Sequence, residues 1–389
     1  MSVNELLNAI DPDVLERIAR QTQANHKVIK LKADILFKLL LYSLLTEKKA
    51  TLRTMEQVFH SPLFQSSAGM EAQKSTSYNS LHDRISTIPA AYFEDLFNHC
   101  RERFEALFQK QNTVSGKTLL RFDSTLVSIG ARMIGMNVSN QKASPEHMVK
   151  FTIGFDGLLP KSAQLFTQSR YSCEDNALPE AIAEAASVID SNTAVVFDRG
   201  LRSRKKLSEL DTEGILFVGR IQPGARMEVL CHYDHRGAED GDSTVTITKD
   251  SSVLLYGKNN KPTKRAFRVI EAVIIKTGKP LWLVTNIVDE PAGVIAALYR
   301  RRWDIEVFFK FLKSELGFSH LAVRNENGMK VMLYATLIAA ILVQAYRHHN
   351  GIKGYKDARM SFVNELEKEL IVQIIVASGG DPQRWTHAP

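Results

Sequence analysis

The first third of the chain shows the helical spacing of apolar positions. It predicts four helices: Leu31–Thr46, Thr51–His60, a third that is capped by Ser75 or Thr76 and ended by Pro89, and Tyr92–Gln109. A short helix, a loop and a short polar helix follow one another in a helix-turn-helix unit, whose second helix enters the major groove of DNA. A plain helical bundle would give the same pattern, so both interpretations stay open. The contacts expected of the first are Ser77, Tyr78, Asn79, His82 and Arg84.

The hydrophobic period changes after Gly116, where alternating or wholly apolar runs indicate strands. The wholly apolar Thr193–Phe197 is expected to be a central, buried strand, and Asp156-Gly157 to turn a hairpin. This order of strands and helices predicts an α/β (α+β) fold with a mixed sheet. The other expected strands are Lys117–Phe122, Met148–Phe155, Leu158–Thr167 and Ile215–Ile221, and the expected helices are Leu178–Ile189 and Ser203–Leu210.

Alternation dominates again from Pro223 to about Ile287, which predicts a β-rich insertion. Helical spacing then returns. The first predicted helix begins after Asp289 and Pro291 and ends at Gly317. Two further helices are expected at Met329–Arg347 and Tyr355–Val376. The predicted regions are a helical DNA-binding domain at 1–112, an α/β core at 113–222, the insertion at 223–288, the final core helix at 289–327, and a C-terminal helical region at 328–389 that could serve dimerisation.

One stripe of the helix that ends at Gly317 carries hydrogen-bonding side chains. Each residue of an α-helix advances about 100°, so Arg302, Glu306 and Lys313 project within about 40° of one another, with Tyr299 about 20° beyond. The neighbouring stripe is apolar, as expected of a face packed into a core. A solvated face with one i, i+4 ion pair is the plain alternative. The position of the carboxylate beside a buried flank favours an active site.

Two aspartates stand at the carboxyl ends of predicted strands, Asp123 after Lys117–Phe122 and Asp198 after Thr193–Phe197. If those strands are neighbours, both carboxylates point into one crevice, and Glu306 on a helix over that edge would complete a cluster of three. Such oxygen ligands suit Mg²⁺ or Mn²⁺, and a pair of these ions catalyses phosphoryl transfer without a side-chain nucleophile. For each aspartate alone, a turn or cap role is the alternative.

Charge and cysteine usage agree with this chemistry. The chain has 50 Lys and Arg against 43 Asp and Glu, a net charge of +7, which favours a polyanionic partner. Three widely spaced cysteines speak against a disulfide framework and for a reducing compartment, and the polar N-terminus does not resemble a signal peptide. Val331–Tyr346 is too short for a membrane span. We therefore expect a cytoplasmic protein. A zinc site at Cys231, His232 and His235 is not favoured, because no second ligand pair follows.

Tyr299, Arg302, Glu306 and Lys313, separated by two, three and six residues, resemble the YREK signature of the insertion sequence four family of bacterial DDE transposases. Trp303 resembles the tryptophan that usually follows the arginine in that family. Asp123 and Asp198 stand in the family's order, each in a similar strand context. The resemblance covers roughly Lys117 to Asn327.

The resemblance implies a ribonuclease H-like catalytic core with a β-rich insertion before the last catalytic helix. Asp123, Asp198 and Glu306 would then be catalytic ligands of two Mg²⁺ or Mn²⁺ ions, and Tyr299, Arg302, Trp303 and Lys313 would bind DNA near the transposon end. The implied reaction is cut-and-paste transposition at inverted-repeat ends of double-stranded DNA, within a dimeric synaptic complex in the bacterial nucleoid. Trp282 is a base-stacking candidate for a hairpin step, although a core tryptophan is the favoured alternative.

Two basic segments could follow a phosphate backbone or form solvated faces. Two other functions also fit the sequence: a nuclease of the same superfamily that does not transfer strands, and a non-catalytic DNA-binding regulator derived from a transposase. The basic segments are Arg199, Arg202, Arg204, Lys205 and Lys206 after Asp198, and Lys258, Lys261, Lys264 and Arg265 within the insertion.

Overall fold

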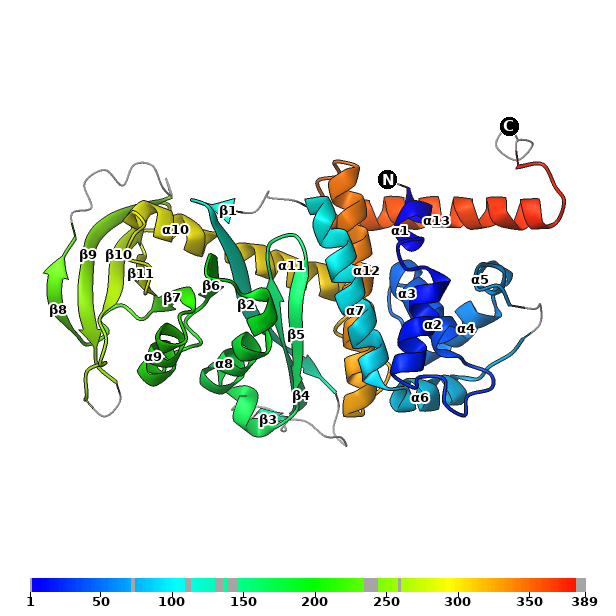
Figure 1. Ribbon diagram of the computed structural model, residues 1–389, viewed down its shortest axis with the longest axis horizontal. Helices are drawn as coiled ribbons and strands as arrows, with labels where there is room; N and C mark the ends of the chain where they lie inside the picture. Colours follow the sequence, from blue (N-terminus) through cyan, green and yellow to red (C-terminus); the bar gives the residue numbers. More distant parts are fainter. Residues whose placement is uncertain are drawn as a thin grey trace. The chain divides into compact units, whose positions relative to one another are not determined.

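The computed structural model describes residues 2–70, 74–108, 113–129, 136–138, 146–233, 244–257 and 260–382. The chain forms two compact units (Figure 1). The helical unit comprises Met1–Gln109, Val127–Ile134 and Phe309–Pro389, and the α/β unit comprises Lys110–Leu126 and Gly135–Phe308. Both ends of the chain therefore belong to the same unit.

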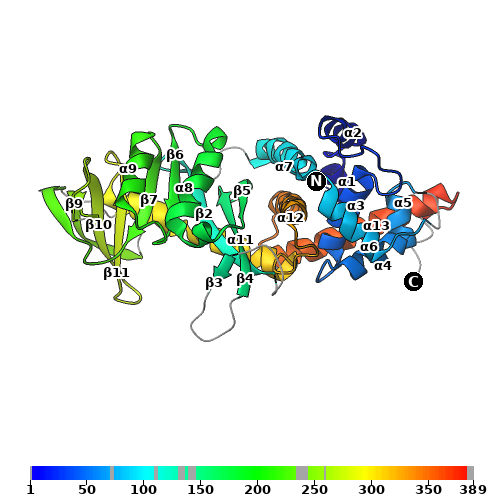
Figure 2. The same ribbon diagram turned by 90° about the horizontal axis from the view of Figure 1, so that it is seen from below.

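The helical unit is built around α12 (Glu326–His349), in which every residue from Val331 to Tyr346 is buried. By length and composition α12 could cross a membrane, but 94% of its most apolar window is buried inside the protein, as expected of a central bundle helix. Helix α7 (Ala90–Glu105) lies beside it in both views (Figures 1 and 2). The other helices are α1 (Val3–Leu7), α2 (Pro12–Gln21), α3 (Ala33–Thr46), α4 (Leu52–His60), α5 (Pro62–Ser67), α6 (Tyr78–Thr87), the 3₁₀ turn η1 (Ala106–Phe108) and α13 (Tyr355–Ala377).

Helix α6, the second helix of the predicted helix-turn-helix unit, differs from expectation in two details. Its cap is Ser77, not Ser75 or Thr76, because the Ser77 hydroxyl accepts a hydrogen bond from the Ser80 amide. Arg84 donates hydrogen bonds to the backbone carbonyls of Leu31 and Ala24, at 2.8 and 2.6 Å. Arg84 therefore ties α6 to the loop before α3 and is not placed as a free DNA contact.

The α/β unit contains one mixed sheet in the order β3-β4-β2-β6-β7-β11-β10-β9-β8, which confirms the predicted mixed α/β fold. Strands β2, β6 and β7 are parallel, and β4 and β5 form the predicted hairpin. The β-rich block adds four antiparallel strands to β7, so it continues this sheet. The strands are β1 (Thr113–Val114), β2 (Lys117–Ser128), β3 (Met136–Val138), β4 (Glu146–Phe155), β5 (Pro160–Phe166), β6 (Thr193–Phe197), β7 (Leu216–Ile221), β8 (Met227–His232), β9 (Val245–Leu255), β10 (Phe267–Ile274) and β11 (Pro280–Thr285).

Helices cover both faces of this sheet, which explains why β6 is apolar throughout. Val195 and Phe197 pack with α8 (Glu174–Glu184) and α9 (Arg204–Thr212), which lie side by side on one face (Figure 2). Ala194 and Val196 pack on the other face with α10 (Ala292–Arg300). Two 3₁₀ turns, η2 (Ser169–Ser172) and η3 (Ala186–Val188), flank α8.

Two of the predicted elements whose bounds differ in the structure carry candidate site residues. Strand β2 does not end at Phe122 but runs through Asp123 to Ser128. The single helix expected before Gly317 is two helices, α10 and α11 (Trp303–Glu315). At the break, the Arg302, Asp304 and Ile305 amides donate to carbonyls three residues earlier, the pattern of a tight 3₁₀ turn. The stripe predicted from Tyr299 to Lys313 is therefore interrupted at Arg302.

Candidate active site

The two predicted aspartates lie at the same level on neighbouring strands. Strands β2 and β6 are hydrogen-bonded in parallel, with Arg121 opposite Val196. Asp123 and Asp198 each come two residues later, so both reach the carboxyl edge of the sheet, where sites of α/β proteins are usually found. The predicted adjacency of these strands is confirmed.

The break between α10 and α11 brings polar groups to this edge. Tyr299, in the last turn of α10, donates its hydroxyl proton to Asp198 Oδ1 at 3.1 Å. Arg302, in the turn, donates Nη2 to Glu306 Oε1, and its guanidinium lies 5.8 Å from the centre of the Tyr299 ring. The charge of Arg302 also lowers the pKa of both Asp123 and Asp198. Arg302 is thus the cation that connects all three carboxylates.

The environments of the two aspartates move their pKa values in opposite directions. Burial raises the pKa of Asp123 to about 6, although the Ser124 amide and Arg302 oppose this rise. Burial acts in the same direction on Asp198, but the Arg199 amide, the charge of Arg302 and the Tyr299 hydroxyl outweigh it and hold the pKa below its usual value. Burial and the neighbouring Asp198 raise the pKa of Tyr299 to about 12, so its hydroxyl stays a donor at neutral pH.

Arg121 fixes the break, although the sequence interpretation did not include it. Its side chain is fully buried, and Nε donates to the Arg301 carbonyl at 2.8 Å. The same guanidinium bonds to the carboxylate of Asp304, at 3.1 Å, and to the carbonyl of Asp156. Arg121 thereby joins the strand that carries Asp123 to the start of the helix that carries Glu306. A charged residue within the apolar run KTLLRF was the signal for this role.

A fourth carboxylate, Glu174, lies behind the aspartates and was also missed. It accepts hydrogen bonds from the buried Lys150 ammonium, at 2.8 Å, and from the Ser124 hydroxyl, at 3.1 Å. Its charge raises the pKa of Asp123. A Cβ on Gly200 would lie 2.5 Å from Glu174 Cγ, so only glycine fits at that point of the loop after Asp198. Glu174 therefore packs between the two segments that carry the aspartates.

The remaining predicted site residues lie apart from this cluster. Lys313 is exposed, about two turns beyond Glu306 on α11. Trp303 begins α11 with 61% of its surface exposed. Trp282 is half-buried on β11 and packs against the core beneath α8 and α9, which favours its core role. His232 bonds to Ser251, and His235 lies outside the described residues.

The donor set suits a divalent metal in its chemistry, because Asp123, Asp198 and Glu306 supply only carboxylate oxygens. Within the described ranges, however, no three such side chains are close enough together to hold an ion. The Arg302 guanidinium donates to Glu306, and its charge acts on both aspartates.

Comparison with known proteins identifies the family of the chain. The family model described as "Transposase DDE domain" matches residues 115–342, more than half of the chain. The chain belongs to this DDE transposase family. The matched range contains Asp123, Asp198 and Glu306.

Several insertion-sequence proteins are related to this transposase. It is 26% identical over 275 residues to the "Putative transposase y4zB" of Sinorhizobium fredii, covering 70% of this chain and 72% of that one. Transposase InsG of insertion sequence element IS4 from Escherichia coli is 24% identical over 234 residues, 57% of this chain and 50% of its own. A solved structure of piggyBac transposase in a synaptic complex with hairpin DNA aligns at a TM-score of 0.47 and 11% identity, covering 100% of this chain and 82% of that one, a likeness too weak to carry a conclusion.

Proposed function

We propose that this chain is a cut-and-paste DNA transposase, which cleaves double-stranded DNA at the inverted-repeat ends of its element and joins those ends to target DNA. The observation that supports the proposal is that Asp123 and Asp198 follow paired positions of two neighbouring parallel strands. Arg302 donates a hydrogen bond to Glu306, and its charge acts on Asp123. The strand order β5-β4-β2-β6-β7 is the reason to interpret the sheet as ribonuclease H-like.

In this proposal Asp123, Asp198 and Glu306 hold two Mg²⁺ or Mn²⁺ ions. Bound ions of this kind activate a water or a 3′-hydroxyl and stabilise the leaving oxygen of an in-line displacement. The raised pKa of Asp123 supports such a role, because a carboxylate that is costly to ionise in the protein is stabilised by an added cation.

The side chains around the carboxylates would position the DNA backbone. The Nε of Arg302 is buried and has no hydrogen-bond partner among the residues that the structure describes, so it is available to a phosphate oxygen. The Tyr299 hydroxyl could donate to a second phosphate oxygen by turning its one proton from Asp198. Trp303 offers an exposed ring at the start of α11, and Lys313 an exposed charge further along it. We assign all four to binding near the transposon end, in a complex that contains two copies of the chain.

The test is cleavage and strand transfer by the purified chain on duplexes that carry the element's inverted repeats, with Mg²⁺ or Mn²⁺. We expect Glu306→Gln to lower cleavage about a thousandfold, or about 4 kcal/mol in activation free energy, while DNA binding persists. Glu271→Gln, on β10 of the same unit, is the matched control and should cleave normally.

The same assay separates the two alternatives. A chain that cuts at the repeat end but never joins it to target is a nuclease without strand transfer. A chain that binds the repeat and cuts in neither metal is a DNA-binding regulator, and the proposal fails.

A further inference from the structure

A cavity of about 460 Å³ opens directly beside Asp198. Apart from Asp198, the charged lining of this cavity is wholly cationic. The cations come from the loop after β6, from the start of α9 and from β7, and they are Arg199, Arg202, Arg204 and Arg220.

Arg220 brings a cation to this cavity beside Asp198. It lies on β7 one residue beyond Gly219, which pairs with Phe197, so it stands level with Asp198. Its buried Nε donor has no hydrogen-bond partner among the described residues. Because an unpaired buried donor is costly, a ligand oxygen at this point would stabilise the site.

A second space, a groove of about 1090 Å³, lies along α9 and the residues between β9 and β10. Arg202 and Arg204 line both the cavity and the groove. At the far end the groove is lined by Lys261 and Lys264, both exposed. The charged lining of the groove is six cations (Arg202, Arg204, Lys205, Lys206, Lys261 and Lys264) against three carboxylates (Asp175, Glu209 and Glu213), so its net charge is positive.

The loop that presents these cations is held rigidly. Asp175 Oδ1 accepts hydrogen bonds from the backbone amides of Arg202 and Ser203, at 2.6 and 2.7 Å. The Ser203 hydroxyl in turn caps α9. Asp175 thus binds backbone amides and not the Arg202 guanidinium. Arg202 lines the groove, and the described part of the chain shows no ion pair for it.

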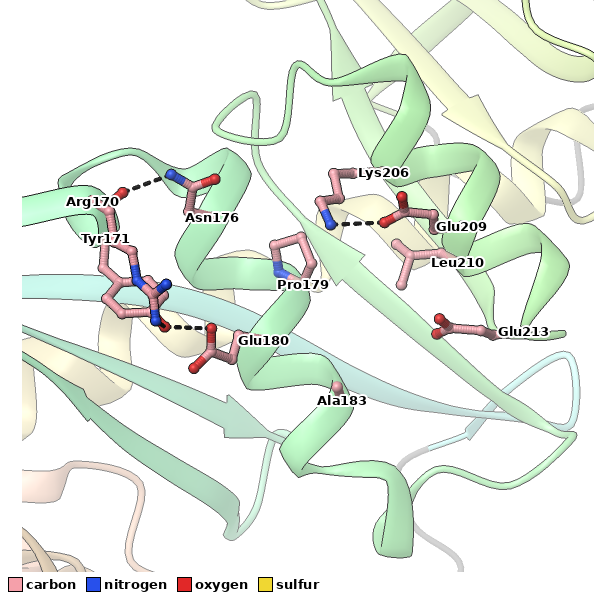
Figure 3. A pocket seen from close by; sticks show the side chains of 10 residues that line it. All are labelled: Arg170, Tyr171, Asn176, Pro179, Glu180, Ala183, Lys206, Glu209, Leu210 and Glu213. Carbon is pink, nitrogen blue, oxygen red and sulfur yellow. Dashed lines mark hydrogen bonds and ion pairs between the residues drawn. The ribbon is translucent and has the colours of Figure 1, made fainter. Parts of the chain in front are cut away.

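The neighbouring cavity between α8 and α9 offers a contrast (Figure 3). Figure 3 shows Lys206 turned toward Glu209, at 2.7 Å, while the Tyr171 hydroxyl lies between Arg170 and Glu180. The two cations of this cavity, Arg170 and Lys206, therefore both have partners within the protein. The cavity has no surplus of cations to offer an anion.

We propose that the groove from Arg220 and Arg202 to Lys261 and Lys264 binds the phosphodiester backbone of DNA that extends past the active site on the Asp198 side. The inference deepens the proposed function and rests on it for the identity of the ligand. The DNA is either the element's own end or the target, two sources with the same backbone chemistry.

The test is DNA binding by the full chain in EDTA, so that no cleavage occurs, over a series of salt concentrations. The variant carries Arg202→Gln, Lys261→Gln and Lys264→Gln, all at exposed positions. The control carries Lys249→Gln, Lys276→Gln and Lys279→Gln, exposed positions of the same unit that do not line the groove. One duplex ends in the inverted repeat and the other has a random sequence.

We expect the groove variant to bind at least tenfold more weakly than the control at 0.15 M salt. Its slope of log affinity against log salt should be shallower by about 2 to 3, since each lost phosphate contact changes it by about 0.9. A loss confined to the repeat duplex identifies the element's end, a loss confined to the random duplex identifies the target, and an equal loss identifies both. Equal affinities and slopes for the two variants overturn the proposal. Because binding is measured without metal, a wild type that binds through the groove but never cleaves would count against the proposed function alone.

Discussion

At the scale of single residues, Asp123 and Asp198 differ in what surrounds their carboxyl groups. Burial dominates at Asp123, where Glu174 and Glu306 add negative charge and the pKa rises to about 6. At Asp198, the Arg199 amide, Arg302 and Tyr299 outweigh burial and the pKa falls. Ionisation of Asp123 therefore destabilises the folded chain, while ionisation of Asp198 stabilises it.

The first prediction concerns Asp123→Asn. The folded protein keeps the Asp123 proton up to about pH 6, whereas the unfolded chain loses it near the ordinary value of 3.8. Stability therefore falls as pH rises between these values and stays reduced above them. We expect the variant to be more stable than wild type at pH 7.5, by on the order of 2 kcal/mol, and equally stable at pH 3.5. Urea unfolding in EDTA over this pH range measures the difference.

The matched control is Asp198→Asn, for which the sign is reversed. The pKa of Asp198 is lowered in the folded state, so its charge stabilises the fold above the unfolded-state pKa. That contribution disappears as pH falls through the folded value. This variant should be less stable than wild type at pH 7.5. Equal behaviour of the two variants would contradict the assignment of opposite environments.

At the scale of secondary structure, the break between α10 and α11 depends on Arg121. In a continuous helix the Arg301 carbonyl would accept from the Ile305 amide. Here Ile305 donates to Arg302, and the Arg301 carbonyl accepts from the Arg121 guanidinium. The break turns Tyr299 toward Asp198 while Glu306 stays on the next helix.

The second prediction concerns Arg121→Met. The change removes the Arg121 donors from Asp304 and from the backbone carbonyls of Leu119, Asp156 and Arg301, which should lower the free energy of unfolding by about 3 kcal/mol. Amide hydrogen exchange around Arg301 to Ile305 should speed up. Arg301→Met is the control, since Arg301 is half-exposed and its ion pair with Asp304, at 3.6 Å, is a surface pair. Wild-type stability and exchange in Arg121→Met would show that the break forms without this contact.

The sequence could predict those parts of the site that depend on local pattern. Thr193–Phe197 is apolar on both faces and ends at Asp198, so the strand and its aspartate were both identifiable. The extension of β2 past Asp123 could not be predicted, because the residue types Asp-Ser-Thr favour a turn. The pairing of β2 with its neighbours in the sheet overrides that local preference. The helix break was also out of reach, since the apolar stripe continues across it and its cause, Arg121, lies 180 residues earlier.

At the scale of the whole molecule, the helical unit is assembled from both ends of the chain. Tyr334 of α12 packs against Phe97 of α7, and its hydroxyl donates to Glu94 at 2.8 Å. Asn327, at the start of α12, donates to the carbonyls of Ser86 and Ile88. The N-terminal helices therefore share one core with a helix that begins more than two hundred residues later.

The third prediction follows from this shared core. A chain that ends at Arg324 lacks α12 and α13, so the faces of α3 and α7 that pack on α12 lose that partner. We expect residues 1–109 of such a chain to lose cooperative unfolding in calorimetry, while the transition of the α/β unit remains. A separate, cooperative transition for the N-terminal helices would instead show that they form an independent domain.

The two-ended construction of the helical unit also sets an order of events during synthesis. Domains usually fold from the N-terminus as the ribosome releases them. Here the first hundred residues emerge early but must wait for α12, while the sheet that carries Asp123 and Asp198 can complete its core beforehand. A ribosome-bound chain would therefore hold its carboxylates in place before its N-terminal helices are finished. Chains released too early would expose those helices to chaperones and proteases.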